Sequence, residues 1–257
     1  MIPVALTIAG SDPSGGAGLQ ADLKTFHRFG VYGEAIPTLI TVQNSQRLTR
    51  VEHLAADLVV AQIQAVLEDM PPDAAKVGAL GSRDVVEAVA SRARVFSFPL
   101  VVDPILSGTL GGLLEQGAFD ALIAQLLPLA FLLTPNLQEA SAITGLAVQD
   151  RDSMIAAGRK ILELGAKNVL VKGGHLTGNA LDLLVTNTGA IHEFNTERIE
   201  TPHTHGSGCT YSAAITAELA KGVPLADAIL SAKRFVTEAI ATNPGLGSGH
   251  GPLNHFA

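Results

Sequence analysis

The most chemically suggestive segment of the sequence is residues 204–210, which read Thr-His-Gly-Ser-Gly-Cys-Thr. Ser207 lies between two glycines, and Cys209 is the only cysteine of the chain. The residues that follow are apolar at helical spacing up to Gly222, which predicts a helix that begins in this segment. The N-terminus of a helix binds anions and lowers the pKa of a thiol. We therefore expect a phosphate-binding loop with a nucleophile or base at its edge.

The same residues allow other interpretations. A Gly-Ser-Gly turn before a helix is common loop chemistry, and a lone cysteine is often an inert core residue. His203, His205 and Cys209 form a possible set of zinc ligands, although the glycines would place the thiol on a helix start, away from both imidazoles. A cysteine hydrolase would need a histidine base, for which His250 is available without support from its neighbours.

Two familiar nucleotide-binding motifs are weak or missing. Gly16-Ala17-Gly18-Leu19-Gln20-Ala21 matches the dinucleotide fingerprint G-x-G-x-x-A. The loop that precedes it, from Gly10 to Gly15, is too long for the tight turn of that fingerprint, and the acidic residue expected about 20 positions later is missing. The sequence contains no G-x-x-x-x-G-K-[ST] motif, which excludes a P-loop enzyme.

Composition excludes several classes of protein. Of the 257 residues, 47% are hydrophobic and only 16% are charged, which indicates a large core within one domain, residues 1–257. The net charge of −7 disfavours nucleic acid as a partner. One cysteine excludes an internal disulfide and suggests a reducing compartment. Without a signal peptide or an apolar run of about 20 residues, we expect a soluble cytoplasmic protein that binds no membrane.

Short apolar runs alternate with longer amphipathic stretches along the chain. The runs lack strict apolar–polar alternation, as expected of strands buried on both faces, and the succession of runs and helices predicts an α/β fold with a mostly parallel sheet. Residues 182–186 and 190–195, joined by Asn-Thr-Gly, predict an antiparallel hairpin at one side. The predicted strands are residues 4–9, 38–42, 100–102, 131–134 and 169–172; the predicted helices are residues 19–29, 58–70, 85–93, 118–126, 153–164 and 226–241.

Polar residues and glycines gather where the predicted strands end. In open α/β sheets, ligands bind beyond the carboxyl ends of the strands. Ordinary turn chemistry explains each residue alone, but an Asp, an Asn, a Lys and a Gln on separate turns together favour a binding site. The groups are Gly10-Ser11-Asp12, Gln43-Asn44, Gly78, Asp103-Pro104, Pro135-Asn136 and Lys172-Gly173-Gly174-His175.

These motifs, in this order, resemble the hydroxymethylpyrimidine and phosphomethylpyrimidine kinases of thiamine biosynthesis, which belong to the ribokinase-like superfamily. The resemblance implies a three-layer α/β/α sandwich and spans the chain from end to end. Pyridoxal kinases are near relatives. The matching motifs are residues 5–26, Gln43-Asn44, Lys76-Val-Gly78, Val102-Asp103-Pro104, residues 134–140, Val171-Lys-Gly-Gly-His175, residues 204–209 and Gly249-His-Gly-Pro252.

The resemblance implies transfer of the γ-phosphoryl group of ATP, with Mg²⁺, to the hydroxymethyl group of 4-amino-5-hydroxymethyl-2-methylpyrimidine, to the phosphate of that compound, or to both. It also implies a homodimer. Gln43 matches the family residue that hydrogen-bonds the pyrimidine ring, and its amide offers a donor and an acceptor. Three further residues, Gly10, Ala17 and Thr41, match positions around the ring. Asp22 falls on the pocket side of the first helix in this comparison, where a capping or solvated role is the alternative.

The resemblance also assigns the phosphate end of the site. Asn136 and Glu139 match an N-x-x-E element near magnesium and the triphosphate, and Asp103 is a second candidate for holding magnesium. Lys172 is a plausible positive charge for the transferred phosphate. Cys209 occupies the position of the catalytic base, and a thiolate there is expected to accept the proton of the substrate hydroxyl. The remaining members of this end are Thr204 for the triphosphate and Gly206, Ser207 and Gly208 for the anion-binding loop.

Two departures from the family pattern concern the pocket. The loop at residues 105–112 is one residue shorter than usual, and we expect residues 108–112 to be its most mobile part; Ala79 replaces a frequent methionine. Neither departure excludes the substrate, because one or two methylenes in a pocket contribute about 1–3 kcal/mol. Two alternatives stay open: a pyridoxal/pyridoxine kinase, and a non-catalytic pyrimidine-binding regulator. The presence of all the site residues disfavours the regulator.

Overall fold

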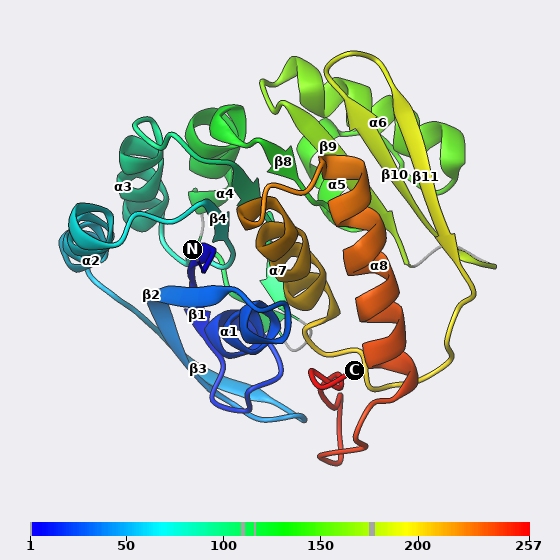
Figure 1. Cartoon of the computed structure of the whole chain (residues 1–257), viewed down its shortest axis with the longest axis horizontal. Helices are drawn as coiled ribbons and strands as arrows, with labels where there is room; N and C mark the ends of the chain where they lie inside the picture. The colour runs from blue at the N-terminus through cyan, green and yellow to red at the C-terminus, as the bar shows by residue number, and fades with distance from the viewer. Residues whose placement is uncertain (1, 109–110, 116, 175–177) are drawn as a thin grey trace.

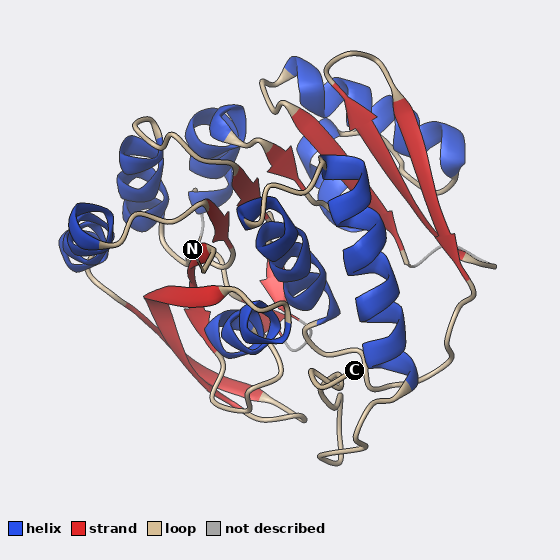
Figure 2. Cartoon of the chain, in the orientation of Figure 1, coloured by secondary structure: helices blue, strands red, loops and turns tan. Residues whose placement is uncertain are grey.

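The protein is represented by a computed structural model that describes residues 2–108, 111–115, 117–174 and 178–257. In these residues, a single nine-stranded sheet carries helices on both faces (Figures 1 and 2). The strand order is β11-β10-β9-β8-β5-β4-β1-β2-β3. The strands are β1 (Val4–Ser11), β2 (Tyr32–Gln43), β3 (Leu48–His53), β4 (Ala74–Val77), β5 (Leu100–Val102), β8 (Leu132–Leu133), β9 (Asn168–Gly173), β10 (Ala180–Thr186) and β11 (Ile191–Thr196).

The central strands are parallel, as predicted. β1 pairs in parallel with both β2 and β4, and the series continues in parallel through β5 and β8 to β9. Ile8 of β1, for example, lies between Ile36 of β2 and Val77 of β4, and all three side chains are fully buried. Side chains on both faces of these strands therefore meet helices, which explains the continuous apolar runs. All six carboxyl ends lie at one edge of the sheet.

Both sides of the sheet end in antiparallel strands. On one side β10 pairs with β9 and β11, which confirms the predicted hairpin. On the other side β3 pairs antiparallel with β2, an addition that the sequence did not reveal. Strand β3 reads Leu-Thr-Arg-Val-Glu-His, and none of its residues is buried, so it lacks the apolar signal of a core strand. Within the described residues, a second sheet of two strands pairs β6 (Ser107–Gly108) with β7 (Gly111–Gly112).

Helices on the two faces enclose two separate apolar cores. One face packs the buried side chains of α2, α3, α5 and α6 against the sheet; the other face packs α1, α7 and α8 (Figure 1). The predicted helix at residues 118–126 is a short α4 followed by a π-helical turn, Leu122–Leu126, and a 3₁₀ turn, Leu127–Leu129. The helices are α1 (Gly18–Arg28), α2 (Ala56–Asp69), α3 (Arg83–Ala93), α4 (Ala118–Ala121), α5 (Leu137–Thr144), α6 (Arg151–Glu163), α7 (Ser207–Ala220) and α8 (Leu225–Ala241).

Helix α7 is the central helix of its layer. Every residue from Cys209 to Ala220 is buried, polar residues such as Ser212 and Thr216 included. The helix lies between α1 and α8 and also contacts β4 and β5, so its N-terminus is held over the carboxyl edge of the sheet (Figure 1). A search of the described helices finds none with the length and apolarity needed to cross a membrane.

Candidate active site

A cavity of about 450 Å³ opens at the carboxyl edge of the parallel strands, beside the start of α7. It is lined by residues from the ends of six strands and from the loop before α7. These elements are far apart in sequence, and only the parallel sheet brings them together. Of the residues expected at the site, the cavity is lined by Gly10, Ala17, Thr41, Gln43, Asp103, Asn136, Glu139, Lys172, Thr204, Gly206, Ser207, Gly208 and Cys209.

The loop before α7 is pressed against the loop after β1. Gly206 is the N-cap of α7 and has a φ of +79°, a conformation that favours glycine. A Cβ atom at Gly206 would lie 1.9 Å from the carbonyl oxygen of Gly16, so no side chain fits there. The first backbone N–H groups of a helix have no partner within it. Since α7 begins at Ser207, its first turn presents such groups to the cavity, as an anion-binding loop requires.

Lys172 is held beside this loop by a buried carboxylate. Its Nζ lies 2.9 Å from Oδ1 of Asp103, which also accepts a hydrogen bond from Thr134. The second oxygen, Oδ2, accepts a hydrogen bond from Ser212 of α7. Burial acts to raise the pKa of Asp103, but the charges of Lys172 and Lys76 outweigh burial and lower it. Asp103 is therefore an ionised anchor for the lysine.

Gly208 permits this close approach. A Cβ atom there would lie 3.3 Å from Nζ of Lys172, a contact tighter than most side chains make. The glycine therefore lets the lysine ammonium reach the backbone of the α7 first turn. The positive charge of Lys172 and the N–H groups of that turn face the same part of the cavity, which is suited to an anionic group.

Glu139 lies at the same end of the cavity and caps its own helix. Asn136 and Glu139 form a capping box at the start of α5: Glu139 N donates to Oδ1 of Asn136 at 2.9 Å, and Asn136 N donates to Oε2 of Glu139 at 2.7 Å. Burial raises the pKa of Glu139 to about 7, although the nearby charge of Lys172 acts to lower it. Both the protonated and the ionised form of the Glu139 carboxyl group are consequently populated near neutral pH.

The expected lowered pKa of Cys209 is wrong. The thiol is in the first turn of α7 and lines the cavity, as predicted, but its residue is only 8% exposed. Burial raises the pKa of Cys209 to about 11, and the opposing effects of Lys76 and the Gly18 backbone are smaller. Loss of water around the sulfur destabilises the thiolate more than the helix N-terminus and the neighbouring Lys76 ammonium stabilise it.

The expected position of Asp22 on the pocket side is also corrected. Asp22 is fully buried, and its Oδ1 pairs with Nζ of Lys76 at 2.5 Å while its Oδ2 accepts a hydrogen bond from Thr7 at 2.7 Å. The cavity lining includes Lys76 but leaves out Asp22. Asp22 holds the pKa of Lys76 above its ordinary value against the effect of burial. Asp22 therefore holds Lys76, which the sequence analysis named only within the Lys76-Val-Gly78 motif and which the structure places in the cavity lining.

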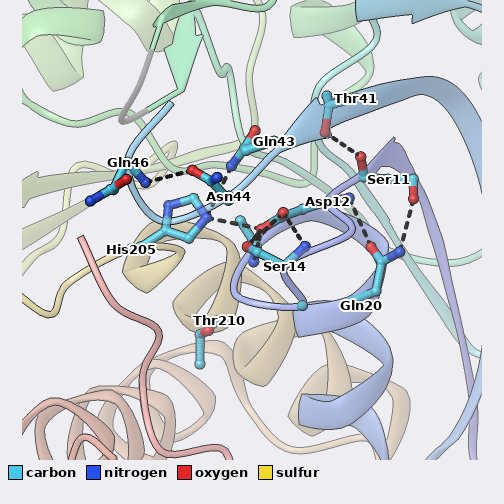
Figure 3. Close-up of polar contacts among 12 residues, drawn as sticks. Ser11, Asp12, Ser14, Gln20, Thr41, Gln43, Asn44, Gln46, His205 and Thr210 are labelled. Atoms are coloured by element: carbon cyan, nitrogen blue, oxygen red, sulfur yellow. Dashed lines mark hydrogen bonds and ion pairs between the residues drawn. The ribbon is translucent and has the colours of Figure 1, made fainter. Parts of the chain in front are cut away.

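Hydroxyl, amide, imidazole and carboxylate groups surround the other end of the cavity (Figure 3). The hydroxyl of Thr41 donates to the carbonyl oxygen of Ser11 at 3.0 Å, which ties β2 to the end of β1. The side chain of Gln43 at the end of β2 lies 3.2 Å from Nε2 of His205. His205 in turn lies 2.9 Å from Oδ2 of Asp12. Gly10 leaves room for Leu39, because a Cβ atom would lie 2.6 Å from the leucine side chain.

The alternative zinc and hydrolase sites do not form. Among the described residues, no group of three His, Cys, Asp or Glu side chains could hold a metal ion. His205 faces Asp12 and Gln43, while His250 is exposed and its Nδ1 lies 3.4 Å from the carbonyl oxygen of Pro202. His250 is not part of the cavity lining and so is not placed to activate Cys209.

The two departures from the family pattern border the cavity. Ala79, 7% exposed, lines it, as do Ile105 and Leu113 on either side of the β6–β7 pair. The expectation of mobility for residues 108–112 falls partly on residues 109–110, which lie outside the described residues. His175 of the Val-Lys-Gly-Gly-His motif lies outside them as well.

A second cavity of about 400 Å³ adjoins the first. Both are lined by Asn136, Lys172, Thr204, Ser207 and Gly208, so they meet at the start of α7. The second cavity then extends between the β10–β11 hairpin and α8. That extension includes apolar and aromatic side chains, among them Tyr211, Val236 and Ile240. The site thus has two compartments that share one cationic, N–H-rich boundary.

The three-layer fold and a site at the helix N-terminus define a ribokinase-like small-molecule kinase. The family model for phosphomethylpyrimidine kinase matches residues 12–254, and the chain belongs to that family. A hydroxymethylpyrimidine/phosphomethylpyrimidine kinase of Rhizobium meliloti strain 1021 is 46% identical over 260 residues, covering 100% of this chain and 98% of that one.

Solved structures agree with this assignment. The phosphomethylpyrimidine kinase of Clostridium difficile 630 has a TM-score of 0.83 at 42% identity, covering 93% of this chain and 99% of that one. An ADP complex of Bacillus subtilis pyridoxal kinase has a TM-score of 0.90 at 40% identity, covering 99% and 98%. The protein is therefore an enzyme of the kinase class, and its fold is shared by kinases that act on two kinds of ring.

Proposed function

We propose that the protein uses ATP to phosphorylate 4-amino-5-hydroxymethyl-2-methylpyrimidine and the monophosphate of that compound, in the biosynthesis of thiamine. The observation that carries the proposal is the arrangement of one cavity: the hydrogen-bonding amide of Gln43 lies at one end, whereas Lys172 and the first turn of α7 form a cationic end. A small ring with a hydroxymethyl group suits this polarity. The ring faces Gln43, and the hydroxyl faces Cys209 and the phosphate donor.

ATP is proposed to occupy the second cavity. Its triphosphate would reach the shared boundary, where Lys172 and the N–H groups of Gly208 and Cys209 stabilise negative charge. Its base would lie toward Tyr211, Val236 and Ile240, which supply apolar surface. Such preorganised donors and cations contribute most of the catalysis in phosphoryl transfer, which needs little covalent help from the protein.

Glu139 is suited to hold Mg²⁺ where the two cavities meet. The buried Glu139 carboxyl group lies near Lys172, and a pKa of about 7 gives it an ionised form near neutral pH. Asp103 is less suited to direct ligation, because its two oxygens already bond Lys172, Thr134 and Ser212. Mg²⁺ commonly uses one or two carboxylates together with phosphate oxygens and water, and when bound it neutralises phosphate charge. Asp103 would then position Lys172.

Cys209 is proposed to receive the proton of the substrate hydroxyl. With a pKa of about 11, roughly one thiol in 10⁴ is ionised at pH 7, so the resting group is a thiol. A loose transition state needs little base assistance before the new O–P bond forms. A thiol cannot take up a further proton, so the proton of the substrate hydroxyl passes to the small thiolate fraction of Cys209, whose negative charge the adjacent Lys76 stabilises.

A coupled assay of ADP release tests the proposal. Hydroxymethylpyrimidine and its monophosphate are supplied separately, each with ATP and Mg²⁺, and ADP is detected through a coupling enzyme. We expect ADP release with both compounds. Binding of the pyrimidine, seen as thermal stabilisation, without ADP release would contradict the proposal and favour a non-catalytic regulator.

Pyridoxal phosphorylation is the second candidate, because the pyridoxal kinase of B. subtilis shares the fold at 40% identity. Pyridoxal also carries a hydroxymethyl group on a nitrogen heterocycle, and Ala79 leaves extra room in the pocket. The assay above, repeated with pyridoxal, separates the two. A kcat/KM higher for pyridoxal than for the pyrimidines would reverse the assignment.

We further propose a cytoplasmic homodimer. Ile40 and Val42 of β2 are 49% and 55% exposed, which leaves apolar surface on the outer part of the sheet for a second copy. The unpaired Cys209 fits a reducing compartment. Light scattering coupled to gel filtration should give twice the chain mass, and cell fractionation should recover the protein with cytoplasmic markers.

A further inference from the structure

His205 lies between Asp12, in the loop after β1, and Gln43, the residue proposed to bind the substrate ring. The histidine is 4% exposed, and its backbone N donates to the carbonyl oxygen of Gly251 at 3.2 Å. Its ring packs on Gly16, where a Cβ atom would lie 2.6 Å from Cδ2. The ring therefore has little freedom to rotate, and its Nε2 is directed at both Asp12 and Gln43 (Figure 3).

Asp12 is surrounded by hydrogen-bond donors. Its Oδ1 accepts from the backbone N and the hydroxyl of Ser14, at 2.9 and 2.7 Å, and its Oδ2 accepts from the backbone N of Ala17 at 2.9 Å. Burial acts to raise the pKa of Asp12, but the hydrogen bonds from His205 and Ser14 outweigh it and lower the pKa. The carboxyl group is thus ionised and can only accept hydrogen bonds.

The ionised Asp12 decides which nitrogen of His205 carries a proton. A bare Nε2 at 2.9 Å from Oδ2 would set two lone pairs against each other, so Nε2 must carry hydrogen. A protonated Nε2 has no lone pair for an amide NH₂ group. The Gln43 atom that lies 3.2 Å from Nε2 of His205 is therefore assigned as the carbonyl oxygen. A rotation of the amide by half a turn, which exchanges Oε1 and Nε2 of Gln43, gives this orientation.

We propose that His205, held by Asp12, is a positioning residue that fixes the amide of Gln43 with its NH₂ group toward the cavity, and thereby sets the preference for an aminopyrimidine ring. This inference rests on the proposed function. In that orientation the NH₂ group donates to a ring nitrogen. The single hydrogen on Nε2 of His205 is shared between Oδ2 of Asp12 and the Gln43 carbonyl oxygen, which keeps its other lone pair for an exocyclic ring amine.

The arrangement discriminates by hydrogen-bond polarity. An aminopyrimidine offers an acceptor nitrogen beside a donor amine, which complements the fixed amide. Pyridoxal has no ring amine, so it leaves the second lone pair of the Gln43 oxygen unused. Sites built around such polar groups reject rings that lack the matching partner more strongly than they reject changes of size. Loss of His205 should therefore affect the two rings unequally.

Three variants test this role in the full chain. His205→Leu removes the donor at similar volume, His205→Gln keeps an N–H near the position of Nε2, and Ser14→Ala removes a different partner of Asp12 as the matched control. We expect His205→Leu to raise the KM for hydroxymethylpyrimidine roughly tenfold, with kcat within about twofold and a smaller change for pyridoxal. His205→Gln should restore most of the KM, and Ser14→Ala should change it less than about twofold.

The protonation of His205 can be measured without turnover. In ¹⁵N NMR of the substrate-free enzyme, with the signal assigned by its loss in His205→Gln, we expect Nε2 to carry a proton at neutral pH. An unprotonated Nε2 would overturn the inference. An unchanged KM in His205→Leu would overturn it too, as would equal losses for both rings in the Leu and Gln variants. If the wild type phosphorylates no pyrimidine while Nε2 is protonated, the proposed function fails and the tautomer assignment stands.

Discussion

The two ends of the first cavity are built from different interactions. At the proposed phosphate end, Lys172 of β9 and Asp103, which follows β5, form a buried ion pair, and Lys76 of β4 pairs with the fully buried Asp22 of α1. At the proposed ring end, the hydroxyl of Thr41 and the amide of Gln43 lie on β2, Gln43 meets the imidazole of His205 from the loop before α7, and His205 pairs with the carboxylate of Asp12. The proposed phosphate end is thus held by buried ion pairs, and the proposed ring end by hydrogen bonds between polar side chains.

This difference suggests how one fold serves two kinds of ring. The pyridoxal kinase of B. subtilis superposes on this chain with a TM-score of 0.90, so the scaffold that positions the phosphate end is shared. Hydrogen-bonding groups such as Thr41 and Gln43, at the end of β2, can change orientation or identity without disturbing buried ion pairs. Removal of one partner of a buried pair, by contrast, leaves an uncompensated charge. Changes at the two ends should therefore have different kinetic signatures.

The largest effect is expected from the thiol at the phosphate end. Cys209→Ala should lower kcat by roughly 10²–10⁴, the range typical for loss of a general base, with little change in KM. Because burial raises the pKa of Cys209 to about 11, the wild-type rate should also increase with pH above 7, and the variant should lose that increase. Steady-state rates between pH 7 and 10 check both points. An unchanged kcat would remove the proton-accepting role and leave the anion-binding loop intact.

A somewhat smaller effect is expected from Lys172→Met. Loss of one preorganised charge that faces the transferred group should lower kcat by roughly 10²–10³. The unpaired Asp103 should also lower the melting temperature, because both of its oxygens stay buried. Lys221→Met, which removes the ammonium that pairs with Glu218 at 2.7 Å at the far end of α7, is the control for loss of positive charge. Equal activity of the two variants would contradict the assignment.

The ring end should respond through KM. Gln43→Leu removes both hydrogen bonds to the ring and should raise the KM for the pyrimidine by about tenfold or more, with kcat and the KM for ATP nearly unchanged. Gln46, an exposed residue in the same turn that bonds Ser248, provides the control Gln46→Leu. A fall in kcat as large as that of Lys172→Met would show that the two ends do not act separately.

The smallest effect concerns a carboxyl group outside both cavities. Glu34 is buried on β2 with no partner in the described residues for either oxygen, unlike the paired carboxylates of the phosphate end. Burial raises its pKa to about 7 from 4.5, so the folded state retains the proton that the unfolded state releases. Its contribution to stability is therefore present below about pH 4.5 and is lost as pH rises to about 7.

Glu34→Gln should remove this loss. We expect the variant to be more stable than the wild type by about 1–2 kcal/mol at pH 8 and equally stable at pH 4, measured by urea unfolding. Glu68→Gln, at an exposed site on α2, should change neither value. Equal unfolding free energies of the wild type and Glu34→Gln at every pH between 4.5 and 8 would contradict this prediction. They would show that Glu34 ionises in the folded protein without loss of stability.

Local sequence patterns were sufficient to predict the strands and the helix that position the site. Apolar runs without alternation predicted parallel strands such as β1, β5 and β9, and the polar residues after them predicted a ligand site at the carboxyl edge. The Gly-Ser-Gly motif predicted the start of α7. These features follow from backbone sterics, hydrogen-bond periodicity and turn chemistry, which act over a few residues and are therefore visible in the sequence.

Tertiary packing decided the chemistry of individual groups. The pKa of Cys209 moved opposite to the expectation because desolvation depends on what surrounds the sulfur, and Asp22 of α1 lies outside the cavity lining, paired with Lys76 of β4. Asp12 and His205 are 193 residues apart, so no local pattern could pair them. Burial and through-space charge depend on the distances between distant segments, and these distances exist only once the chain has folded.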